Sequence, residues 1–482
     1  MIWGVKRHNV MIGRKKELVL LKKAYESKES QLVAIYGRRR VGKTYLVNEA
    51  FNHAFAFHHS GLKRGGLKAQ LKQFRLSLRQ QGHWDCPTLN DWQEAFFELG
   101  NFLAGQPEGR KVVFLDEMPW MDTFRSNFLM AFEGFWNGWA AFRTDILLIV
   151  CGSATTWILK KIVHSREGLH NRLSERIRLE PFTLHECRQY VEDAGLGFDR
   201  RQIAECYMAL GGVAYYWSQL AKGLSAEQNI NRLFFTKDEG LCDEFEELYS
   251  SLFKNPGLYK SIILALGKRR CGLTRDEILA EIGKPSGGDV TRCLEELEEC
   301  GFIRKYHVVG AKKRGSLYQL IDNLSLFHMQ FASANRSFPD NCWTAYVPEG
   351  TKNAWRGLAF ERLCLEHVRQ IKEALGISGV AVEVYAWRQQ GTAPEHPGVQ
   401  IDLLLDRKDG IINLCEMKYT NGEYALDNAE LERMINRRET FRTACDIKKS
   451  IHLTLITSNG LHHNQYSGNI QSELTLEDLF RE

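Results

Sequence analysis

Residues 37–44 combine glycines, basic side chains and a hydroxyl in a spacing that suits phosphate binding. They read Gly-Arg-Arg-Arg-Val-Gly-Lys-Thr, which fits the pattern G-x-x-x-x-G-K-[ST]. Glycines let the backbone curl so that N–H groups face phosphate oxygens, and the following helix adds partial positive charge. Lys43 is expected to reach the β- and γ-phosphates of ATP, and Thr44 to bind Mg²⁺. The predicted nucleotide-binding residues of the loop are Gly37, Arg38, Arg39, Arg40, Val41, Gly42, Lys43 and Thr44.

The segments around this loop fit the strand–loop–helix context that the motif requires. Residues 31–36 are apolar enough for a buried strand, and residues 45–50 are typical of the start of a helix. A chance match to the eight letters is the alternative, and the flanking segments favour nucleotide binding.

Two further strand ends carry polar side chains. Residues 111–117 predict a buried strand that ends in Asp116 and Glu117. Asp116 is expected to hold Mg²⁺ through water, and Glu117 to polarise the attacking water, although a solvated strand end is the alternative. A second strand, 146–151, precedes Ser153. Because ligands sit at the carboxyl ends of parallel strands, Ser153 is expected to contact the γ-phosphate or the water. A helix N-cap role for this serine is equally consistent with the local sequence.

Several motifs over residues 10–240 resemble the archaeal-type ATPase family, within the AAA-type and STAND-class P-loop ATPases. Residues 11–18 are similar to F-x-G-R-x-x-E-L, residues 36–44 to Y-G-R-R-R-x-G-K-[ST], and residues 179–182 to L-x-P-F. Residues 211–216 are similar to G-G-x-P-x-Y, with Ala214 in place of proline. Residues 168–172 stand where the family shows P-L-Y-G-R, and only Leu169 and Arg172 match. The resemblance implies that Arg172 completes the ATP site, in cis or from a neighbouring subunit; a surface arginine is the alternative.

The middle of the chain predicts a winged helix. Residues 259–265, 274–282 and 289–300 predict three helices, with Thr274 and Glu277 forming a capping box at the second. Residues 302–309 and 316–320 predict a hairpin with Lys312, Lys313 and Arg314 at its tip. The third helix carries four glutamates, which DNA phosphates would repel. A packing or hinge module is therefore favoured over groove recognition, and both remain open.

A second chemical constellation lies in the last third. Asp402 is near the start of one predicted strand, and Glu416 and Lys418 share a face of the next, after a turn at Asp409-Gly410. Two carboxylates can hold Mg²⁺ against a phosphate, and a lysine can position water. Asp…Glu-x-Lys on adjacent strands resembles the PD-(D/E)xK nucleases, which implies Asp402 and Glu416 as metal ligands and Lys418 as catalytic. The resemblance also implies that Glu361, on a preceding helix, adds an acidic side chain. Mn²⁺ is a second candidate ion, and an inactive relative used as a binding platform is the alternative.

Composition bounds these hypotheses. The 482 residues suggest two to four domains, and 64 Lys and Arg against 59 Asp and Glu give a net charge of +5, which permits nucleic-acid binding without arguing for it. None of the 12 cysteines forms a C-x-x-C pair, which predicts reduced, mostly buried thiols and neither disulfides nor a zinc site. The first residues lack a signal peptide, and no run of eighteen apolar residues occurs. We therefore expect a cytoplasmic protein with no membrane partner.

The sequence as a whole predicts an α/β protein. The expected parts are a P-loop NTPase core with a parallel sheet (1–180), a helical lid (181–250), a winged-helix domain (251–335) and a restriction-endonuclease-like α/β domain (345–482). The predicted function is ATP hydrolysis coupled to a Mg²⁺-dependent nuclease acting on nucleic acid, taken to be DNA. The alternative is a non-cutting ATPase switch that binds DNA or a protein partner. The sequence leaves a homo-oligomer open.

Overall fold

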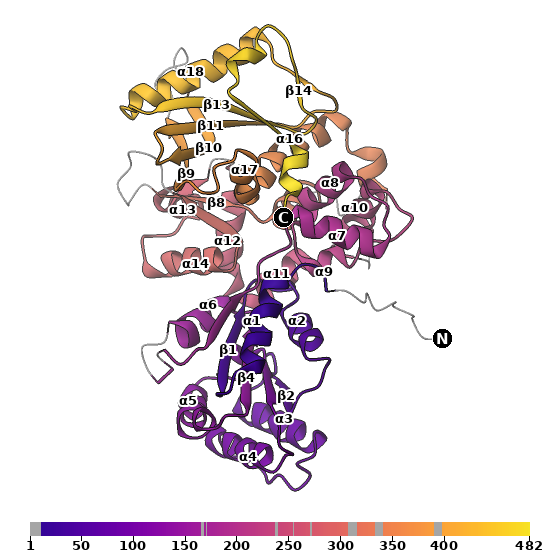
Figure 1. Cartoon of the computed structure of the whole chain (residues 1–482), viewed down its shortest axis with the longest axis vertical. Coiled ribbons are helices and arrows are strands. Elements are labelled where there is room, and N and C mark those ends of the chain that lie inside the picture. The colour runs from indigo at the N-terminus through magenta and orange to yellow at the C-terminus, as the bar shows by residue number, and fades with distance from the viewer. Residues whose placement is uncertain are drawn as a thin grey trace. The chain divides into compact units, whose positions relative to one another are not determined.

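The computed structural model describes residues 11–482 except 165–167, 170, 237–239, 254, 270–271, 307–315, 333–340 and 390–397 (Figure 1). The chain forms two compact units, Met1–Pro181 and Phe182–Glu482. The predicted hairpin tip with Lys312, Lys313 and Arg314 lies outside the described residues, as does His170. The domain boundaries predicted at 250 and at 335–345 fall inside the second unit.

The first unit is built on a five-stranded parallel sheet in the order β2-β3-β4-β1-β5. Its strands are β1 (Gln31–Tyr36), β2 (Phe57–Ser60), β3 (Lys111–Asp116), β4 (Ile146–Gly152) and β5 (Glu175–Arg178). Its helices are α1 (Lys15–Glu26), α2 (Lys43–Ala50), α3 (Leu67–Gln80), α4 (Trp92–Ala104), α5 (Phe128–Gly138) and α6 (Thr155–Ile158). The chain therefore has the predicted α/β fold with a parallel sheet.

Alternation along the buried strands gives this sheet two apolar faces. Val33 and Ile35 of β1 pack with residues of α1 and α2 on one face. Leu32 and Ala34 face the other way, into a larger core that includes residues of α3, α4 and α5. Because strands covered on both faces expose little except their ends, polar side chains that act on a ligand must gather at a sheet edge.

The second unit begins with helices and continues into a small antiparallel sheet. The first helices are α7 (Leu184–Ala194), α8 (Arg200–Leu210), α9 (Ala214–Trp217), α10 (Ala226–Phe235) and α11 (Glu244–Leu252). There follow α12 (Pro256–Gly267), β6 (Leu273–Thr274), α13 (Arg275–Glu281), α14 (Gly288–Glu299), β7 (Ile303–Tyr306), β8 (Leu317–Leu320) and α15 (Asn323–Phe327). The strands pair in the order β6-β8-β7. The predicted capping box is confirmed, because Thr274 and Glu277 each accept a backbone N–H of the other.

The last part of the second unit is a five-stranded mixed sheet in the order β15-β13-β11-β10-β9. Its elements are α16 (Glu349–Glu366), α17 (Val368–Ala374), β9 (Val382–Gln389), β10 (Val399–Arg407), β11 (Ile411–Lys418), α18 (Asn428–Ala444), β13 (Ser450–Thr457) and β15 (Ser472–Thr475). A separate pair is formed by β12 (Tyr424–Ala425) and β14 (Leu461–His462). β10 pairs antiparallel with both β9 and β11. β13 pairs parallel with both β11 and β15.

Ion pairs tie the early helices of the second unit to α16. Arg356 of α16 lies 3.2 Å from Glu205 of α8 and 2.8 Å from Glu227 of α10. Lys352 also reaches Glu227, at 3.2 Å. Since Arg356 and Lys352 are both buried, these contacts belong to the interior of the unit.

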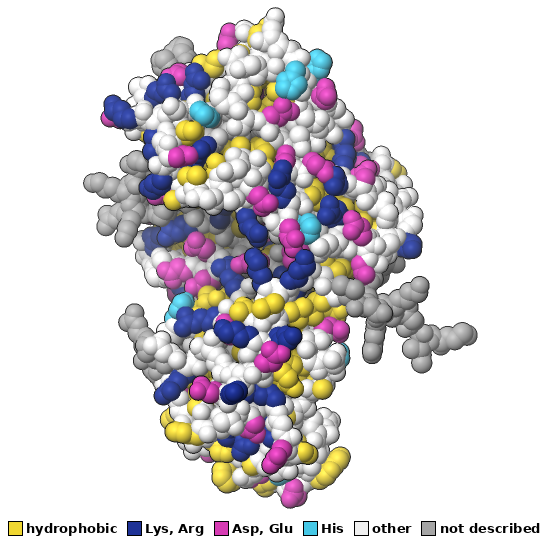
Figure 2. All heavy atoms as spheres, in the orientation of Figure 1, with side chains coloured by type: hydrophobic (Ala, Val, Ile, Leu, Met, Phe, Trp, Pro, Cys, Tyr) yellow, Lys and Arg dark blue, Asp and Glu magenta, His cyan; other side chains and the backbone are white. Residues whose placement is uncertain are grey.

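Both signs of charge share the surface. Figure 2 shows Lys and Arg side chains interspersed with Asp and Glu on the face that it draws. Across the described ranges, every helix falls short of the length and apolar character that crossing a membrane requires.

Candidate functional site

The loop between β1 and α2 depends on glycines at two positions. Gly37 has φ +142° and Gly42 has φ +96°, in the region that side chains rarely adopt. A β-carbon at Gly37 would also lie 2.3 Å from the backbone oxygen of Leu179. Arg40 takes a left-handed conformation as well, with φ 69°. The backbone of residues 37–42 is thus curled where the sequence predicts a phosphate cradle.

Three buried side chains anchor the loop. Val41 packs in the core beside α1 and α2, and Arg14 donates to its carbonyl oxygen at 3.3 Å. Lys43 donates from Nζ to the carbonyl oxygens of Gly37 and Arg38, both at 2.9 Å. The lysine ammonium therefore sits inside the curl of the loop, where an anion's oxygens could replace the two carbonyls.

Parallel register brings Thr44 and Asp116 together. The carboxyl ends of β1, β4 and β3 meet at one edge of the sheet. There the Thr44 hydroxyl donates to Oδ2 of Asp116 at 2.8 Å, and the backbone N–H of Glu117 donates to Oδ1 at 2.9 Å. A hydroxyl and a carboxylate this close are oxygen ligands of the kind that Mg²⁺ prefers. Thr44 and Asp116 therefore fit a magnesium site beside the loop.

Glu117 is held by Ser153 across the end of β4. The backbone N–H and hydroxyl of Ser153 both donate to Oε2 of Glu117, at 3.1 and 2.9 Å. Burial raises the pKa of Glu117, whereas the Ser153 donors and the nearby Lys43 oppose this shift. The next helix, α6, begins after Ala154, so Ser153 is not its N-cap. The structure thus gives Ser153 a contact with the carboxylate, while a direct contact with phosphate or water stays a prediction.

Arg172 lies at the other end of the sheet. It is exposed and precedes β5, whose first residue Glu175 pairs with Val33 near the start of β1. The Ser174 backbone N–H donates to Leu32 at 2.9 Å, which fixes this segment beside the amino end of β1. A six-residue strand spans roughly 15 to 20 Å, so the structure does not bring Arg172 to Thr44 and Asp116 of its own chain. Action from a neighbouring copy remains a prediction.

Antiparallel register places Asp402 opposite Glu416 in the second unit. Leu403 pairs with Cys415, so the next positions outward are Asp402 and Glu416. On its other side β10 changes register against β9 between Ile401 and Leu404. An irregularity of this kind re-aims side chains and often lies beside active sites.

Glu416 and Lys418 share one face of β11, as the sequence predicts, and two residues of α18 join them. Lys418 Nζ lies 2.9 Å from Oε1 of Glu416 and 2.8 Å from Oε1 of Glu430. Arg437 donates to Oε2 of Glu416. We call Asp402, Glu416, Lys418, Glu430 and Arg437 the carboxylate cluster. Sequence reasoning missed Glu430 and Arg437, whose spacing along α18 gives no signal of its own.

The electrostatics of the carboxylate cluster suit cation binding. Burial raises the pKa of Asp402, the amide of Gln400 lowers it, and the neighbouring Glu416 raises it. Burial lowers the pKa of Lys418, but Glu416 and Glu430 more than offset this, so its pKa lies above the usual value. Asp402 and Glu416 therefore form a like-charged pair that a divalent cation would relieve, and they fit Mg²⁺ or Mn²⁺.

Glu361 lies on α16, which packs against β11. Cys364 of α16 and Cys415 of β11 are both buried, and Cys415 is near enough to add to the rise that burial causes in the pKa of the Cys364 thiol. Because side chains alternate along a strand, Cys415 faces away from Glu416 and Lys418. α16 thus covers the other face of β11, and a role for Glu361 in the carboxylate cluster stays a prediction.

Comparisons with known proteins give distant likenesses. The chain is 23% identical over 420 residues to an uncharacterized protein of Methanocaldococcus jannaschii, a match that covers 85% of this chain and 88% of that protein. No protein-family model matches the chain. A Walker-type ATPase of Pyrococcus abyssi is similar in structure with a TM-score of 0.46 and 15% identity, covering 66% of this chain and 96% of that one. The ORC2 protein of Aeropyrum pernix has a TM-score of 0.41 and 15% identity, over 68% and 96%. Function must therefore be argued from this chain's own geometry.

Lys418 is expected to stabilise the second unit, because it separates two carboxylates that are largely removed from water. Lys418→Met should lower the free energy of unfolding at pH 7 by about 1 to 3 kcal/mol. The raised pKa makes this contribution constant below the ordinary lysine value of about 10.4, and it is lost only as the pH rises through the raised pKa. Urea unfolding of the unmodified and Lys418→Met chains, followed by fluorescence, measures the loss of stability. The loss should be the same at pH 7 and at pH about 9.

The matched control is Lys408→Met. Lys408 forms an exposed ion pair with Glu383 at 3.0 Å, so its loss should cost much less stability than the loss of Lys418. Equal effects of the two substitutions would show that Lys418 contributes no more than a surface ion pair.

Proposed function

We propose that the first unit binds ATP with Mg²⁺ and hydrolyses it. The observation that carries the proposal is the edge of the parallel sheet, where Thr44 contacts Asp116 and Ser153 holds Glu117. The curled loop before α2 lies beside this edge. A phosphate cradle, two oxygen ligands and a carboxylate base are the parts that phosphoryl transfer to water requires.

Each residue has a separate task in this proposal. The backbone N–H groups of residues 37–42 and the Lys43 ammonium bind phosphate oxygens, and Thr44 and Asp116 hold Mg²⁺. When bound, Mg²⁺ neutralises phosphate charge. Glu117 accepts a proton from the attacking water, and Ser153 keeps the Glu117 carboxylate oriented.

Lys43→Ala should weaken ATP binding, and Glu117→Gln should bind ATP normally but hydrolyse it at least about 100-fold more slowly. An amide keeps the shape of the carboxylate and can still accept from Ser153, but it cannot take a proton. Binding of a fluorescent ATP analogue and release of phosphate measure the two effects separately. Glu117 must be deprotonated to act as a base, and burial raises its pKa. As the pH is lowered, the rate of hydrolysis by the unmodified chain should therefore begin to fall at a higher pH than the ordinary pKa of a glutamate would give.

Normal turnover in Lys43→Ala would contradict the ATP site. Equal loss of binding and turnover in Glu117→Gln would show that Glu117 supports the structure of the loop and does not act as a base.

We further propose that Arg172 acts on the ATP site of a neighbouring copy. Its exposure and its place at the opposite end of the sheet support a role between subunits. A guanidinium can neutralise charge that develops on the γ-phosphate. Mixing inactive Arg172→Ala with inactive Lys43→Ala should restore part of the turnover, since one copy then keeps an intact loop and the other an intact arginine. Mixtures without activity, or an active Arg172→Ala chain, would contradict this.

For the second unit we propose a Mg²⁺-dependent nuclease acting on DNA, coupled to ATP turnover. Support comes from the register that puts Asp402 opposite Glu416, and from Lys418 on the same face as Glu416. Asp402 and Glu416 would hold the ion, and Lys418 would position water and offset phosphate charge. Bound Mg²⁺ would supply a Lewis acid at the scissile phosphate.

The alternative remains a non-cutting switch in which residues 251–335, as a winged helix, and the carboxylate cluster bind DNA or a protein. Arg437 and Lys418 already occupy both oxygens of Glu416, which favours this alternative. Glu295, Glu296, Glu298 and Glu299 lie on α14, so this helix is a poor groove reader. In this alternative DNA would be bound by other parts of the winged helix or by the nuclease-like domain, and not by α14.

Asp402→Asn should reduce metal-dependent DNA cleavage by about two orders of magnitude or more and leave basal ATP hydrolysis unchanged. Asparagine has the same size as aspartate but lacks the negative charge that binds a divalent metal ion. Cleavage of single- and double-stranded DNA with Mg²⁺ or Mn²⁺, with and without ATP, measures the effect. Asp409→Asn is the matched control, because Asp409 pairs with Arg407 in the turn after β10 and should not affect cleavage. Cleavage that persists in Asp402→Asn would contradict the nuclease site, and an unmodified chain that binds DNA without cutting it would favour the switch.

A further inference from the structure

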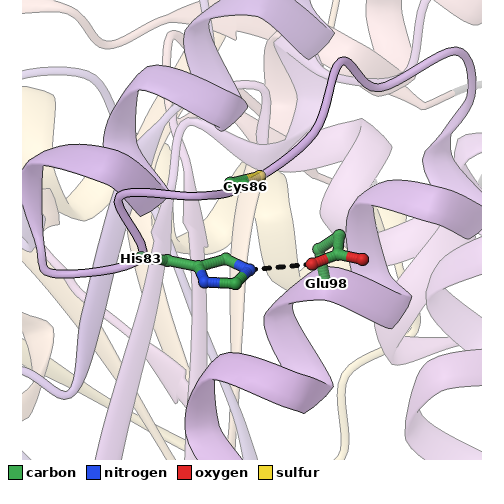
Figure 3. A group of neighbouring side chains, drawn as sticks. All are labelled: His83, Cys86 and Glu98. Carbon is green, nitrogen blue, oxygen red and sulfur yellow. Dashed lines mark hydrogen bonds and ion pairs between the residues drawn. The ribbon is translucent and has the colours of Figure 1, made fainter.

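Three side chains that can bind a transition metal meet in the first unit, away from the loop that precedes α2. His83 and Cys86 lie in the segment between α3 and α4, and Glu98 lies on α4 (Figure 3). One ligand atom from each residue lies within 4.8 Å of the other two. The three residues come from two different elements, so their convergence is a result of tertiary packing.

The distances are close to those of a metal site. Nε2 of His83 lies 2.8 Å from Oε2 of Glu98. Zinc bonds of about 2.0 to 2.3 Å in a tetrahedral arrangement separate neighbouring ligand atoms by roughly 3.3 to 3.6 Å. The distance between Nε2 of His83 and Oε2 of Glu98 would have to lengthen by roughly half an ångström. The ligand atoms lie within 4.8 Å of one another, so the sulfur of Cys86 would have to move inward by about one ångström. Side-chain rotation can supply both shifts.

A second carboxylate orients the histidine as metal-binding histidines usually require. Nδ1 of His83 lies 3.2 Å from Oδ1 of Asp85. The Asp85 carboxylate, whose side chain is 93% exposed, can accept from an N–H on Nδ1, which would leave the lone pair of Nε2 for a metal in place of its contact with Glu98. The ring also stacks on Phe102, with centroids 5.7 Å apart. His83 is thus held in place on both sides.

Cys86 supplies the soft ligand. Its side chain is 1% exposed, and its backbone oxygen accepts from Nε of Arg75 at 3.0 Å. A nitrogen, a sulfur and a carboxylate oxygen together suit Zn²⁺ and disfavour Mg²⁺, which prefers oxygen.

We propose that His83, Cys86 and Glu98 bind one Zn²⁺ ion, with water in the fourth position, and that the ion fastens the segment between α3 and α4 to α4. This site is separate from the Thr44 and Asp116 site and does not depend on the proposed functions. The cysteine spacing predicted no zinc site, because only one cysteine takes part and Glu98 comes from a different element. Three protein ligands leave one coordination position open to solvent.

The test uses the full chain without a histidine tag, stripped with a chelator and titrated with Co²⁺. One Co²⁺ per chain should bind with a thiolate-to-metal charge-transfer band, and Zn²⁺ should displace it. Cys86→Ser should lose the band, and Glu98→Gln, which keeps a hydrogen-bonding group beside His83, should weaken Zn²⁺ binding at least tenfold. Asp85→Asn should weaken it by about 10- to 100-fold. Cys445→Ser is the control, because Cys445 is a partly buried thiol in the second unit and should leave band and affinity unchanged.

Circular dichroism of each variant separates lost binding from lost folding, and Glu98→Gln tests the site without touching the buried thiol. An unmodified chain that shows no charge-transfer band would overturn the proposal. So would a band that persists in Cys86→Ser, or a Zn²⁺ affinity that is the same in Glu98→Gln as in the unmodified chain.

Discussion

Carboxylates that the fold withdraws from water constrain every site in this protein. A carboxylate loses solvation when it is buried, and this loss must be offset by donors or cations nearby. Glu117 receives two donors from Ser153, and Glu416 receives Lys418 and Arg437. For Glu117 the donors do not fully offset burial, since its pKa is still raised. Beside Glu416, burial and the neighbouring carboxylate raise the pKa of Asp402.

The parts of the first candidate site are local in the sequence. The loop at 37–44 and the strand end at 116–117 are contiguous patterns, and parallel pairing brings strand ends to one edge without further information. The role of Ser153 cannot be predicted from the local sequence, which is consistent with either a ligand contact or a helix cap. The structure excludes the cap, because α6 begins after Ala154. β4 lies beside β3, which places Ser153 next to Glu117, and a ligand contact stays a prediction.

The carboxylate cluster was only half predictable. Asp402, Glu416 and Lys418 follow from strand alternation and a turn signal at Asp409-Gly410, both short-range patterns. Glu430 and Arg437 come from α18, where charged residues occur on all sides and the sequence cannot tell an inward one from an outward one. The change of register beside Asp402 depends on how β9 pairs with β10, which neither strand encodes alone. The predicted α16 contributor, Glu361, illustrates the same limit, because a helix can cover either face of a sheet.

The charge balance of the carboxylate cluster bears on the proposal that Asp402 and Glu416 hold a divalent ion. Lys418 and Arg437 are similarly covered, with side chains 27% and 32% exposed, and each holds one oxygen of Glu416. A divalent ion at Glu416 would have to displace at least one of these two cations from a carboxylate that is itself only 14% exposed. The next residue after Lys418 is Tyr419, whose hydroxyl donates at 3.1 Å to Glu205 of α8, the residue that also pairs with Arg356. The end of β11 is therefore tied, through Glu205, to the same ion pairs that join α8 to α16.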